Sequence, residues 1–192
     1  MVLGRLIFLS VLFTALPLPC RAEVQENTTY SFYDVTPGRS TLHKAMTAAY
    51  PFQKAGEEHH AYTNWHIDWH FDYVPGSGGL CNISKVETTL TETMTLPRLV
   101  SATSGAMQRK FDDYLPKLKF HEDGHLKIAR DTAHAIDTAL SAIRDVPCDN
   151  IATQANDAAQ DIFARAVAAE KDYDIQTGHG KTQGAVLDQA PP

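Results

Sequence analysis

Hydrophobic positions divide the chain into a strand-forming first half and a helical second half. From residue 61 to 73 the sequence alternates strictly, with Thr63, Trp65, Ile67, Trp69, Phe71 and Tyr73 on one side and Asn64, His66, Asp68, His70 and Asp72 on the other. This alternation predicts a strand with one buried face. Two segments rich in β-branched and aromatic residues, 29–36 and 81–96, predict further strands that end at Pro37 and Pro97.

The second half of the chain carries the spacing of amphipathic helices. Apolar residues recur every three or four positions from about residue 106 to 144, which predicts one long helix. Pro116 would mark a kink in this helix or its first turn. A second helix is predicted over about 150–173, and a short one over 40–49. We therefore expect an α+β fold, in which a small antiparallel or mixed sheet packs on a helical hairpin.

The buried stripe of the long helix contains the motif His121-Glu122-Asp123-Gly124-His125. Residues four apart lie on one helical face, so both imidazoles can reach one Zn²⁺ while Glu122 lies beside a water molecule. Burying these groups without partners would cost several kcal/mol. A core histidine pair with ordinary hydrogen bonds is the alternative. The motif predicts a zinc site and a zincin-like fold, with His121 and His125 as ligands.

Catalytic zinc takes three protein ligands and one water, so this motif lacks a ligand. The metzincin pattern would require glycine where Ile128 stands, and is rejected. The helix continues for about 28 Å beyond His125, so an antiparallel return reaches the metal near residues 169–175. Four residues are candidates for the third ligand: Glu170, Asp172, Asp174 and His179. Glu170 and Asp174 are four residues apart. This spacing is found in the gluzincin pattern, in which the Glu binds the metal and the Asp contacts a ligand but not the metal.

Two motifs, HEDGH at 121–125 and Tyr173-Asp174-Ile175-Gln176-Thr177-Gly178-His179-Gly180, resemble those of a known family. It is the bacterial predicted secreted Zn-dependent protease family, domain of unknown function 922, and the similarity covers roughly residues 29–186. The resemblance implies a metallopeptidase with a zinc site. Because the family pattern includes His179 and not Glu170, it implies His179 as the third ligand, with Glu170 as the alternative.

The chemistry of such a site follows from its ligands. Zn²⁺ lowers the pKa of a bound water to about 7, and Glu122 would take its proton and pass it to the leaving amine. Tyr173 is a candidate donor to the oxyanion, and Asp174 could orient a ligand imidazole. These roles predict a zinc-dependent endopeptidase or amide hydrolase acting on peptide or protein. The alternatives are a non-catalytic peptide-binding domain with a structural zinc and a metallohydrolase of cell-wall amides.

The N-terminus has the features of a secretory signal peptide over residues 1–22. Arg5 precedes an apolar stretch that is too short to span a membrane comfortably, and Cys20-Arg21-Ala22 resembles a cleavage site. We therefore expect an exported protein, periplasmic or secreted. Its metallopeptidase domain would cover residues 23–186, followed by a disordered tail at 187–192.

The chain is acidic and contains three cysteines. Loss of Arg5 and Arg21 with the signal makes the formal charge of −6 more negative by two, and this acidic balance argues against a nucleic-acid partner. Cys81 and Cys148 remain as the two cysteines of an exported chain, which predicts a disulfide. The sequence leaves the oligomeric state open.

Overall fold

The computed structural model of the chain describes residues 24–53, 58–101 and 104–187. The predicted signal peptide (1–22) and residues 188–192 of the predicted tail lie outside these ranges. The elements are β1 (Gln25–Val35), α1 (Leu42–Ala49), β2 (Tyr62–Pro75), β3 (Leu80–Leu99), α2 (Gly105–Ser141), β4 (Val146–Pro147), α3 (Ile151–Thr177) and a 3-10 turn, η1 (Lys181–Gln183).

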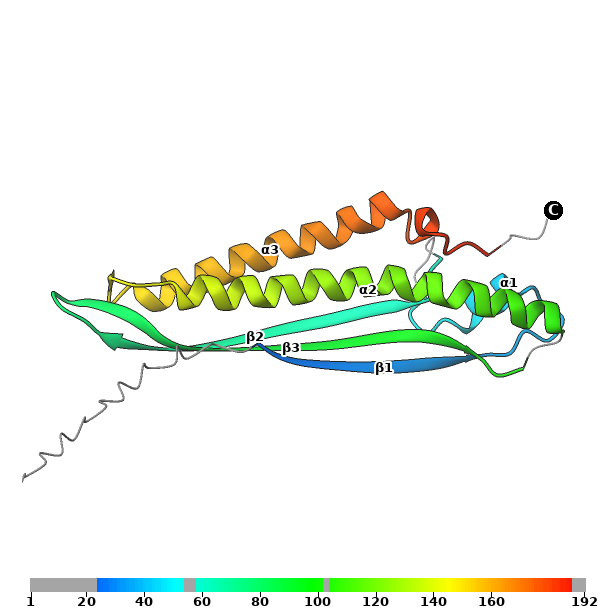
Figure 1. Cartoon of the computed structure of the whole chain (residues 1–192), viewed down its shortest axis with the longest axis horizontal. Helices are drawn as coiled ribbons and strands as arrows, with labels where there is room; N and C mark the ends of the chain where they lie inside the picture. Colours follow the sequence, from blue (N-terminus) through cyan, green and yellow to red (C-terminus); the bar gives the residue numbers. More distant parts are fainter. Residues whose placement is uncertain (1–23, 54–57, 102–103, 188–192) are drawn as a thin grey trace, which may run out of the picture.

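A mixed sheet forms one layer of the molecule and helices α2 and α3 form the other (Figure 1). The central strand is β3, which pairs parallel with β1 and antiparallel with β2, while the short β4 pairs with the start of β3. Helix α2 runs along the sheet, and α3 packs beside α2. The predicted α+β class with a mixed sheet is therefore confirmed.

The alternation predicted for β2 is present along most of the strand. Ile67 is buried, Trp65 and Trp69 are half-buried, and the polar positions between them are exposed. Tyr73, which was expected on the buried face, is exposed. The register does shift between Asp72 and Tyr73, but the extra residue is Ser84 of β3, so β2 keeps its alternation. Tyr73 is exposed because it lies close to the end of the strand at Pro75.

The prediction that β3 ends before Pro97 is wrong, because the strand continues to Leu99. Pairing with β2 stops at Thr95, opposite Tyr62, whereas pairing with β1 continues to Leu99. Pro97 thus lies where β3 has one neighbouring strand, so its missing N–H costs no bond to β2.

Both long helices differ from their predicted bounds. Helix α2 begins at Gly105 after Ser104, whose side chain accepts a hydrogen bond from the Met107 N–H. Pro116 therefore lies within the helix and not in its first turn. Helix α3 continues to Thr177, one turn beyond the predicted end, and stops at Gly178 in the left-handed conformation. The extra turn places Asp174 on the helix.

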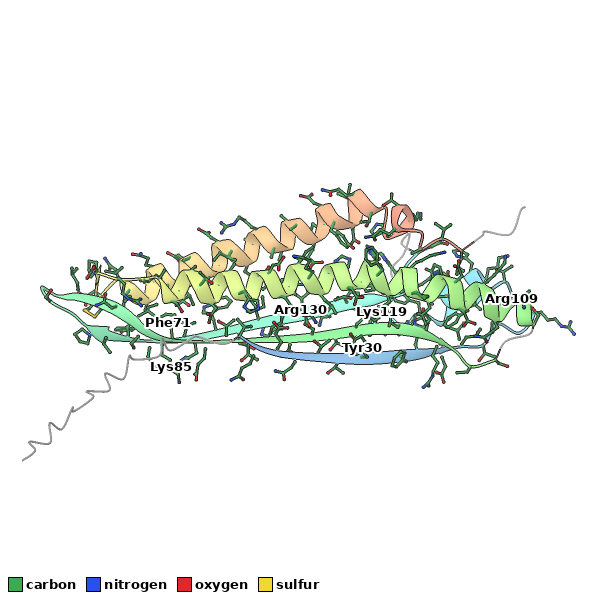
Figure 2. All side chains as sticks on the ribbon, viewed as in Figure 1. Tyr30, Phe71, Lys85, Arg109, Lys119 and Arg130 are labelled. Carbon is green, nitrogen blue, oxygen red and sulfur yellow. A yellow bond between two sulfur atoms is a disulfide. The ribbon has the colours of Figure 1, made fainter. Side chains whose placement is uncertain are left out.

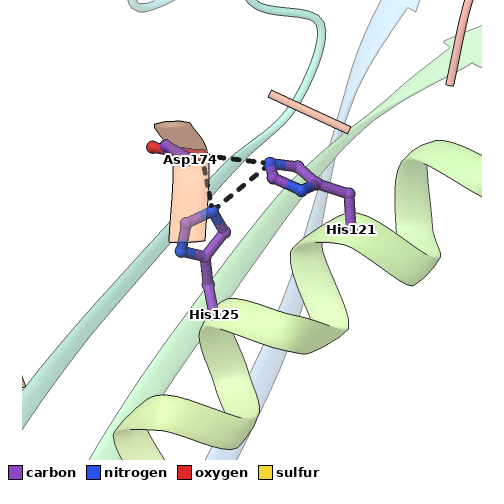
Figure 3. A group of neighbouring side chains, drawn as sticks. All are labelled: His121, His125 and Asp174. Carbon is purple, nitrogen blue, oxygen red and sulfur yellow. Dashed lines mark hydrogen bonds and ion pairs between the residues drawn. The ribbon is translucent and has the colours of Figure 1, made fainter. Parts of the chain in front are cut away.

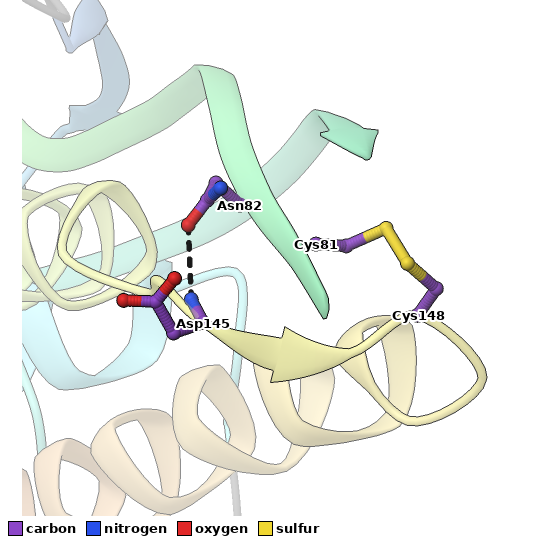
Figure 4. The surroundings of a disulfide bond; sticks show 4 residues. All are labelled: Cys81, Asn82, Asp145 and Cys148. Atoms are coloured by element: carbon purple, nitrogen blue, oxygen red, sulfur yellow. Dashed lines mark hydrogen bonds between the residues drawn. A yellow bond between two sulfur atoms is a disulfide. The ribbon is translucent and has the colours of Figure 1, made fainter. Parts of the chain in front are cut away.

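A disulfide between Cys81 and Cys148 confirms the predicted pairing (Figure 4). It joins the start of β3 to the segment that leads into α3. Beside it, the Asp145 N–H donates to the Asn82 side-chain oxygen over 2.9 Å. These contacts fasten the connection between α2 and α3 to the sheet.

In the part of the chain that the structure describes, no helix combines the length and the apolar character needed to cross a bilayer.

Candidate metal centre

Helix α2 brings two imidazole rings against one carboxylate of α3 (Figure 3). The Nε2 atoms of His121 and His125 are 3.4 Å apart, and Asp174 Oδ1 lies 3.2 Å from each of them. Both histidines are buried, with exposed fractions of 4% and 8%. Among the described residues, His121, His125 and Asp174 are the one group of three side chains that could hold a metal ion with their ligand atoms in mutual reach. This candidate site is called the metal group below.

The other nitrogen of each ring is held by a hydrogen-bond acceptor. Nδ1 of His125 contacts Glu170 Oε2, and Nδ1 of His121 lies 3.0 Å from Gln183 Oε1. A carboxylate can only accept, so His125 carries its hydrogen on Nδ1. Gln183 donates its Nε2 to the Tyr173 hydroxyl oxygen, which turns its own oxygen toward His121. In their neutral form, both rings therefore direct an Nε2 lone pair toward Asp174.

With both rings neutral, three acceptor atoms converge on one point, an arrangement that can hold a cation. Ligand atoms about 2.0 to 2.1 Å from a tetrahedral Zn²⁺ lie about 3.3 to 3.4 Å from one another. The observed separations of 3.2, 3.2 and 3.4 Å fit this geometry. Metal-binding histidines commonly donate their second nitrogen to a carboxylate or carbonyl, as both rings do here. The donor set fits a metal ion.

The pKa shifts within the group also favour a positive charge between the two imidazole rings. Burial disfavours protonation of His125, but hydrogen bonds to Asp174 and Glu170 outweigh it and raise the pKa of His125 to about 10. Burial likewise opposes ionisation of Asp174, yet the hydrogen bonds with His121 and His125 hold the pKa of Asp174 well below its ordinary value. The carboxylates therefore favour positive charge between the rings, which a proton or a metal ion can supply.

Glu122 lies beside this group but takes no part in it. Its side chain is buried, and the Thr63 hydroxyl donates to Oε2 over 2.7 Å from β2. Burial raises the pKa of Glu122, although Thr63 and both histidines oppose the shift. A carboxylate with a raised pKa is a better proton acceptor near neutral pH.

Tyr173 packs against both histidine rings. Its ring is parallel to that of His121, with centroids 5.1 Å apart, and meets His125 edge-on at 4.9 Å. Its hydroxyl donates to the His121 carbonyl oxygen over 3.1 Å and accepts from Gln183 over 3.0 Å. The hydroxyl hydrogen is thus directed at the α2 backbone, and the role of Tyr173 as an oxyanion donor stays a prediction.

His179 lies at the edge of the group. Its Nδ1 is 3.4 Å from Asp174 Oδ1, its side chain is 52% exposed, and its ring meets the edge of His59. It is not among the three residues whose ligand atoms converge. Its role as third ligand stays a prediction, as does that of Glu170, which contacts the outer nitrogen of His125. The exposed Asp172 does not belong to the group either.

The segment after α3 is shaped to approach His121. Gly180 has a φ of +82°, and a Cβ atom there would lie 3.1 Å from His121 Cβ. Glycine is therefore favoured at position 180 for two reasons: its positive φ and the short distance to His121. Thr177 places its hydroxyl oxygen 3.4 Å from His121 Nδ1. The Thr177-Gly178-His179-Gly180 segment thus folds back over the metal group.

Three supporting residues were missed by sequence analysis. Gln183 follows the helix in a short turn with no recognisable pattern, so nothing in the sequence indicates its contact with His121. Thr63 stands on the predicted buried face of β2, where a hydroxyl could have suggested a buried polar partner. Trp65, two residues later, donates its indole N–H to Glu170 Oε1 over 3.0 Å. The Glu170 carboxylate is therefore held by Trp65 of β2 as well as by His125.

Two adjoining cavities flank the group, with volumes of about 720 and 480 Å³. Both are lined by His121 and Glu122, and both contact His59 and Ala61. The larger cavity extends along Tyr114, Leu118, Ala185, Val186 and Leu187. The smaller one extends along Tyr50, Phe52 and Tyr62, whose rings contact one another in sequence through Phe52. The metal group therefore lies where two hollows of the surface meet.

Comparison with known proteins identifies a family but no activity. The family model described as "Bacterial protein of unknown function (DUF922)" matches residues 28–180, which include every residue of the metal group. No curated protein and no solved structure matches the chain.

Proposed function

Since the chain belongs to the DUF922 family, whose function is unknown, we propose its function from the site itself: a zinc-dependent hydrolase that cleaves amide bonds within peptide or protein substrates. The observation that carries this proposal is the convergence of His121 Nε2, His125 Nε2 and Asp174 Oδ1 at tetrahedral spacing. Asp174 takes the place of the third ligand.

The donor set favours zinc over Mg²⁺ and Ca²⁺. Mg²⁺ and Ca²⁺ prefer sites made of oxygen, whereas two imidazoles and one carboxylate are typical zinc donors. Three protein ligands leave one of four positions free, which is the arrangement of catalytic zinc. A structural zinc would have its four positions filled by the protein.

The neighbouring residues support hydrolysis. Bound Zn²⁺ would supply Lewis acidity, polarising a substrate carbonyl and lowering the pKa of water. Glu122 takes one proton from the attacking water as the new C–O bond forms. It returns this proton to the leaving nitrogen as the C–N bond breaks. Thr63 fixes the Glu122 carboxylate in position, and Gln183 and Glu170 fix the two imidazoles.

The two cavities support cleavage inside a chain over removal of terminal residues. They meet at His121 and Glu122, so a substrate centred on the metal has room on both sides of its scissile bond. The smaller cavity offers an aromatic wall that includes Phe52 and Tyr62, which are 51% and 43% exposed. An apolar side chain next to the scissile bond would fit this wall.

Export is part of the proposal. The predicted signal peptide supports it, and so does the disulfide between Cys81 and Cys148, because disulfides persist in oxidising compartments. We propose a periplasmic or secreted enzyme.

The variant Glu122→Gln tests the proposal. The purified mature protein, loaded with Zn²⁺, is assayed on an unfolded protein, on quenched fluorogenic peptides and on peptidoglycan. We expect the wild type to cleave protein and peptide, and Glu122→Gln to lose activity by about 10²- to 10⁴-fold while it keeps its zinc. Asp123→Asn is the matched control, because that neighbouring carboxylate binds Lys119 and lies outside the site.

Three results would redirect the proposal. Zinc bound without turnover of any substrate would favour the non-catalytic peptide-binding domain. Cleavage of peptidoglycan alone would favour the hydrolase of cell-wall amides. Equal activity in Glu122→Gln and wild type would remove Glu122 from the mechanism.

A further inference from the structure

Most of the eleven-residue strand β1 is exposed to solvent. Its first eight residues are exposed on both faces of the sheet. In the described sheet its inner edge pairs with β3 and its outer edge with no strand. Among its side chains are Tyr30 and Phe32, which are 47% and 52% exposed. Lys119 Nζ of α2 lies 5.6 Å from the centroid of the Tyr30 ring, so this part of β1 runs beside the helix (Figure 2).

Within the described part of the chain, strand β1 lacks the sequence features and the bulges that protect a sheet edge from pairing. Free edges are normally blunted by lysine, proline, bulges or a covering element. Residues 25–35 contain no lysine, proline or glycine, and the register with β3 runs without a shift. The two acidic side chains of the strand are already paired: Glu26 with Arg130 and His134, and Asp34 with Arg98.

The opposite edge of the sheet provides an internal comparison. Strand β2 ends at Pro75, and its register with β3 shifts where Ser84 of β3 has no partner. Helix α3 also reaches over it, since Trp65 contacts Phe163 and Trp69 donates to Asn156. Among the described residues, the β2 edge is thus partly covered by α3, whereas no strand pairs with the outer edge of β1.

The sequence of β1 is complementary to itself in one antiparallel register. If Ser31 lies opposite Ser31 of a second copy, Tyr30 faces Phe32 of that copy, and the same pair recurs across the two-fold axis. Asp34 then faces Thr28 and Thr29 faces Tyr33, so no like charges oppose each other. Aromatic cross-strand pairs stabilise a sheet, and the exposed rings would cover one another. In the register centred on Tyr30, by contrast, Glu26 would oppose Asp34 of the second copy.

We propose that β1 is the dimer interface of this protein, with two copies joined edge to edge through antiparallel β1 strands centred on Ser31. The result is one continuous sheet with a two-fold axis, the commonest symmetry of soluble homo-oligomers. The metal group lies on the helical side of the sheet, so the interface leaves both sites accessible. The proposal does not depend on the proposed hydrolase activity.

Sedimentation velocity of the purified mature protein over a hundredfold range of concentration tests the interface. We expect a dimer for the wild type and a monomer for Phe32→Lys, because a charged residue at this position opposes edge pairing. The half-exposed Phe32 side chain lies outside the core, so the variant should keep its circular dichroism spectrum and melting temperature. His66→Lys, on the opposite edge strand, is the matched control and should stay dimeric.

Cysteine crosslinking tests the register without reference to stability. Opposed Cα atoms in antiparallel strands are about 4.5 to 5.5 Å apart, which lies within the range of disulfides. Ser31→Cys should therefore form a disulfide-linked dimer that a reducing agent cleaves. In Thr29→Cys the two cysteines would be roughly 13 Å apart along the strands and should not crosslink. A wild-type monomer at every concentration, a dimer that survives Phe32→Lys, or crosslinking through Thr29→Cys in place of Ser31→Cys would overturn the proposal.

Discussion

A Cβ atom at Gly124 would lie 2.0 Å from the hydroxyl oxygen of Tyr173, a distance at which one of the two residues must move. Glycine in the HEDGH motif therefore makes room for the ring that stacks on His121. The two motifs recognised in the sequence thus meet in space, because a residue of one fits a gap in the other.

The variant Gly124→Ala should be destabilised and should bind metal more weakly. Alanine in a helix interior usually adds about 1 kcal/mol of stability over glycine, so a loss would have the opposite sign. The cause is displacement of Tyr173, which packs on both metal-binding rings. Thermal unfolding of the protein with and without metal measures the effect. Gly105→Ala, whose Cβ would meet its nearest atom at 3.5 Å, is the control; equal behaviour of the two variants would contradict the packing argument.

Glu170 and Gln183 should contribute to metal affinity without binding the metal. Each holds the outer nitrogen of one imidazole, and loss of such a partner typically weakens metal binding about 10- to 100-fold. Glu170→Ala and Gln183→Ala should therefore still bind one metal ion, with reduced affinity in competition with a chelating dye. Gln176→Ala, an exposed position of α3, serves as the control. Unchanged affinity in both variants would mean that other contacts orient the rings.

His60 should make the protein sensitive to acid. It is buried between the hydroxyl groups of Thr47 and Tyr114, and burial lowers the pKa of His60 from 6.5 to about 4, with His43 and His59 adding to the shift. Above pH 6.5 the ring is neutral in both the folded and unfolded states. As the pH falls from 6.5 toward 4, His60 becomes protonated in the unfolded state but stays neutral in the folded state. The free energy of unfolding therefore falls by about 3 kcal/mol.

Urea unfolding between pH 7 and pH 4 measures this loss. The pH slope of the free energy of unfolding should be smaller in His60→Gln than in the wild type, whatever the stability of the variant at neutral pH. His70→Gln, whose side chain is 75% exposed, should keep the wild-type slope. Identical slopes in all three proteins would exclude His60 as the source.

The disulfide should contribute to stability and not to the metal centre. Cys81 and Cys148 are separated by 67 residues, and closing such a loop restricts the unfolded chain by about 4 kcal/mol in the chain-entropy account. At about 2 to 4 °C per kcal/mol, the double variant Cys81→Ser/Cys148→Ser should melt roughly 10 °C lower. Its metal content should be unchanged, because the disulfide lies at the end of the helices remote from η1 (Figure 1). Loss of metal would show that the two regions are coupled.

Periodicity predicted the elements that carry the metal group and the turns of α3 that approach it. The rise of a helix locates the return of α3 near residues 169–175, and both Glu170 and Asp174 reach the histidines there. Helical pitch could not decide which carboxylate faces Nε2, because this depends on differences of a few ångströms in how the helices pack. The structure has Asp174 between the rings and Glu170 behind His125.

The path of the chain after α3 could not be predicted from the sequence. Gln183 reaches His121 because three successive residues, Gly178, His179 and Gly180, adopt positive φ after the helix ends at Thr177. No sequence pattern fixes such a path. The continuation of β3 through Pro97 was missed for a related reason, since it depends on where β2 stops pairing. The zincin-like fold, the zinc and the hydrolase activity stay predictions.

Metal content of the purified mature protein, measured by plasma mass spectrometry after zinc loading and desalting, tests the central claim most directly. Wild type is compared with His121→Ala, Asp174→Ala and His179→Ala. We predict one zinc per chain in wild type and in His179→Ala, and its loss from His121→Ala and Asp174→Ala. Zinc kept by Asp174→Ala but lost from His179→Ala would contradict the assignment of the third ligand, and a wild type without zinc would contradict the metal centre itself.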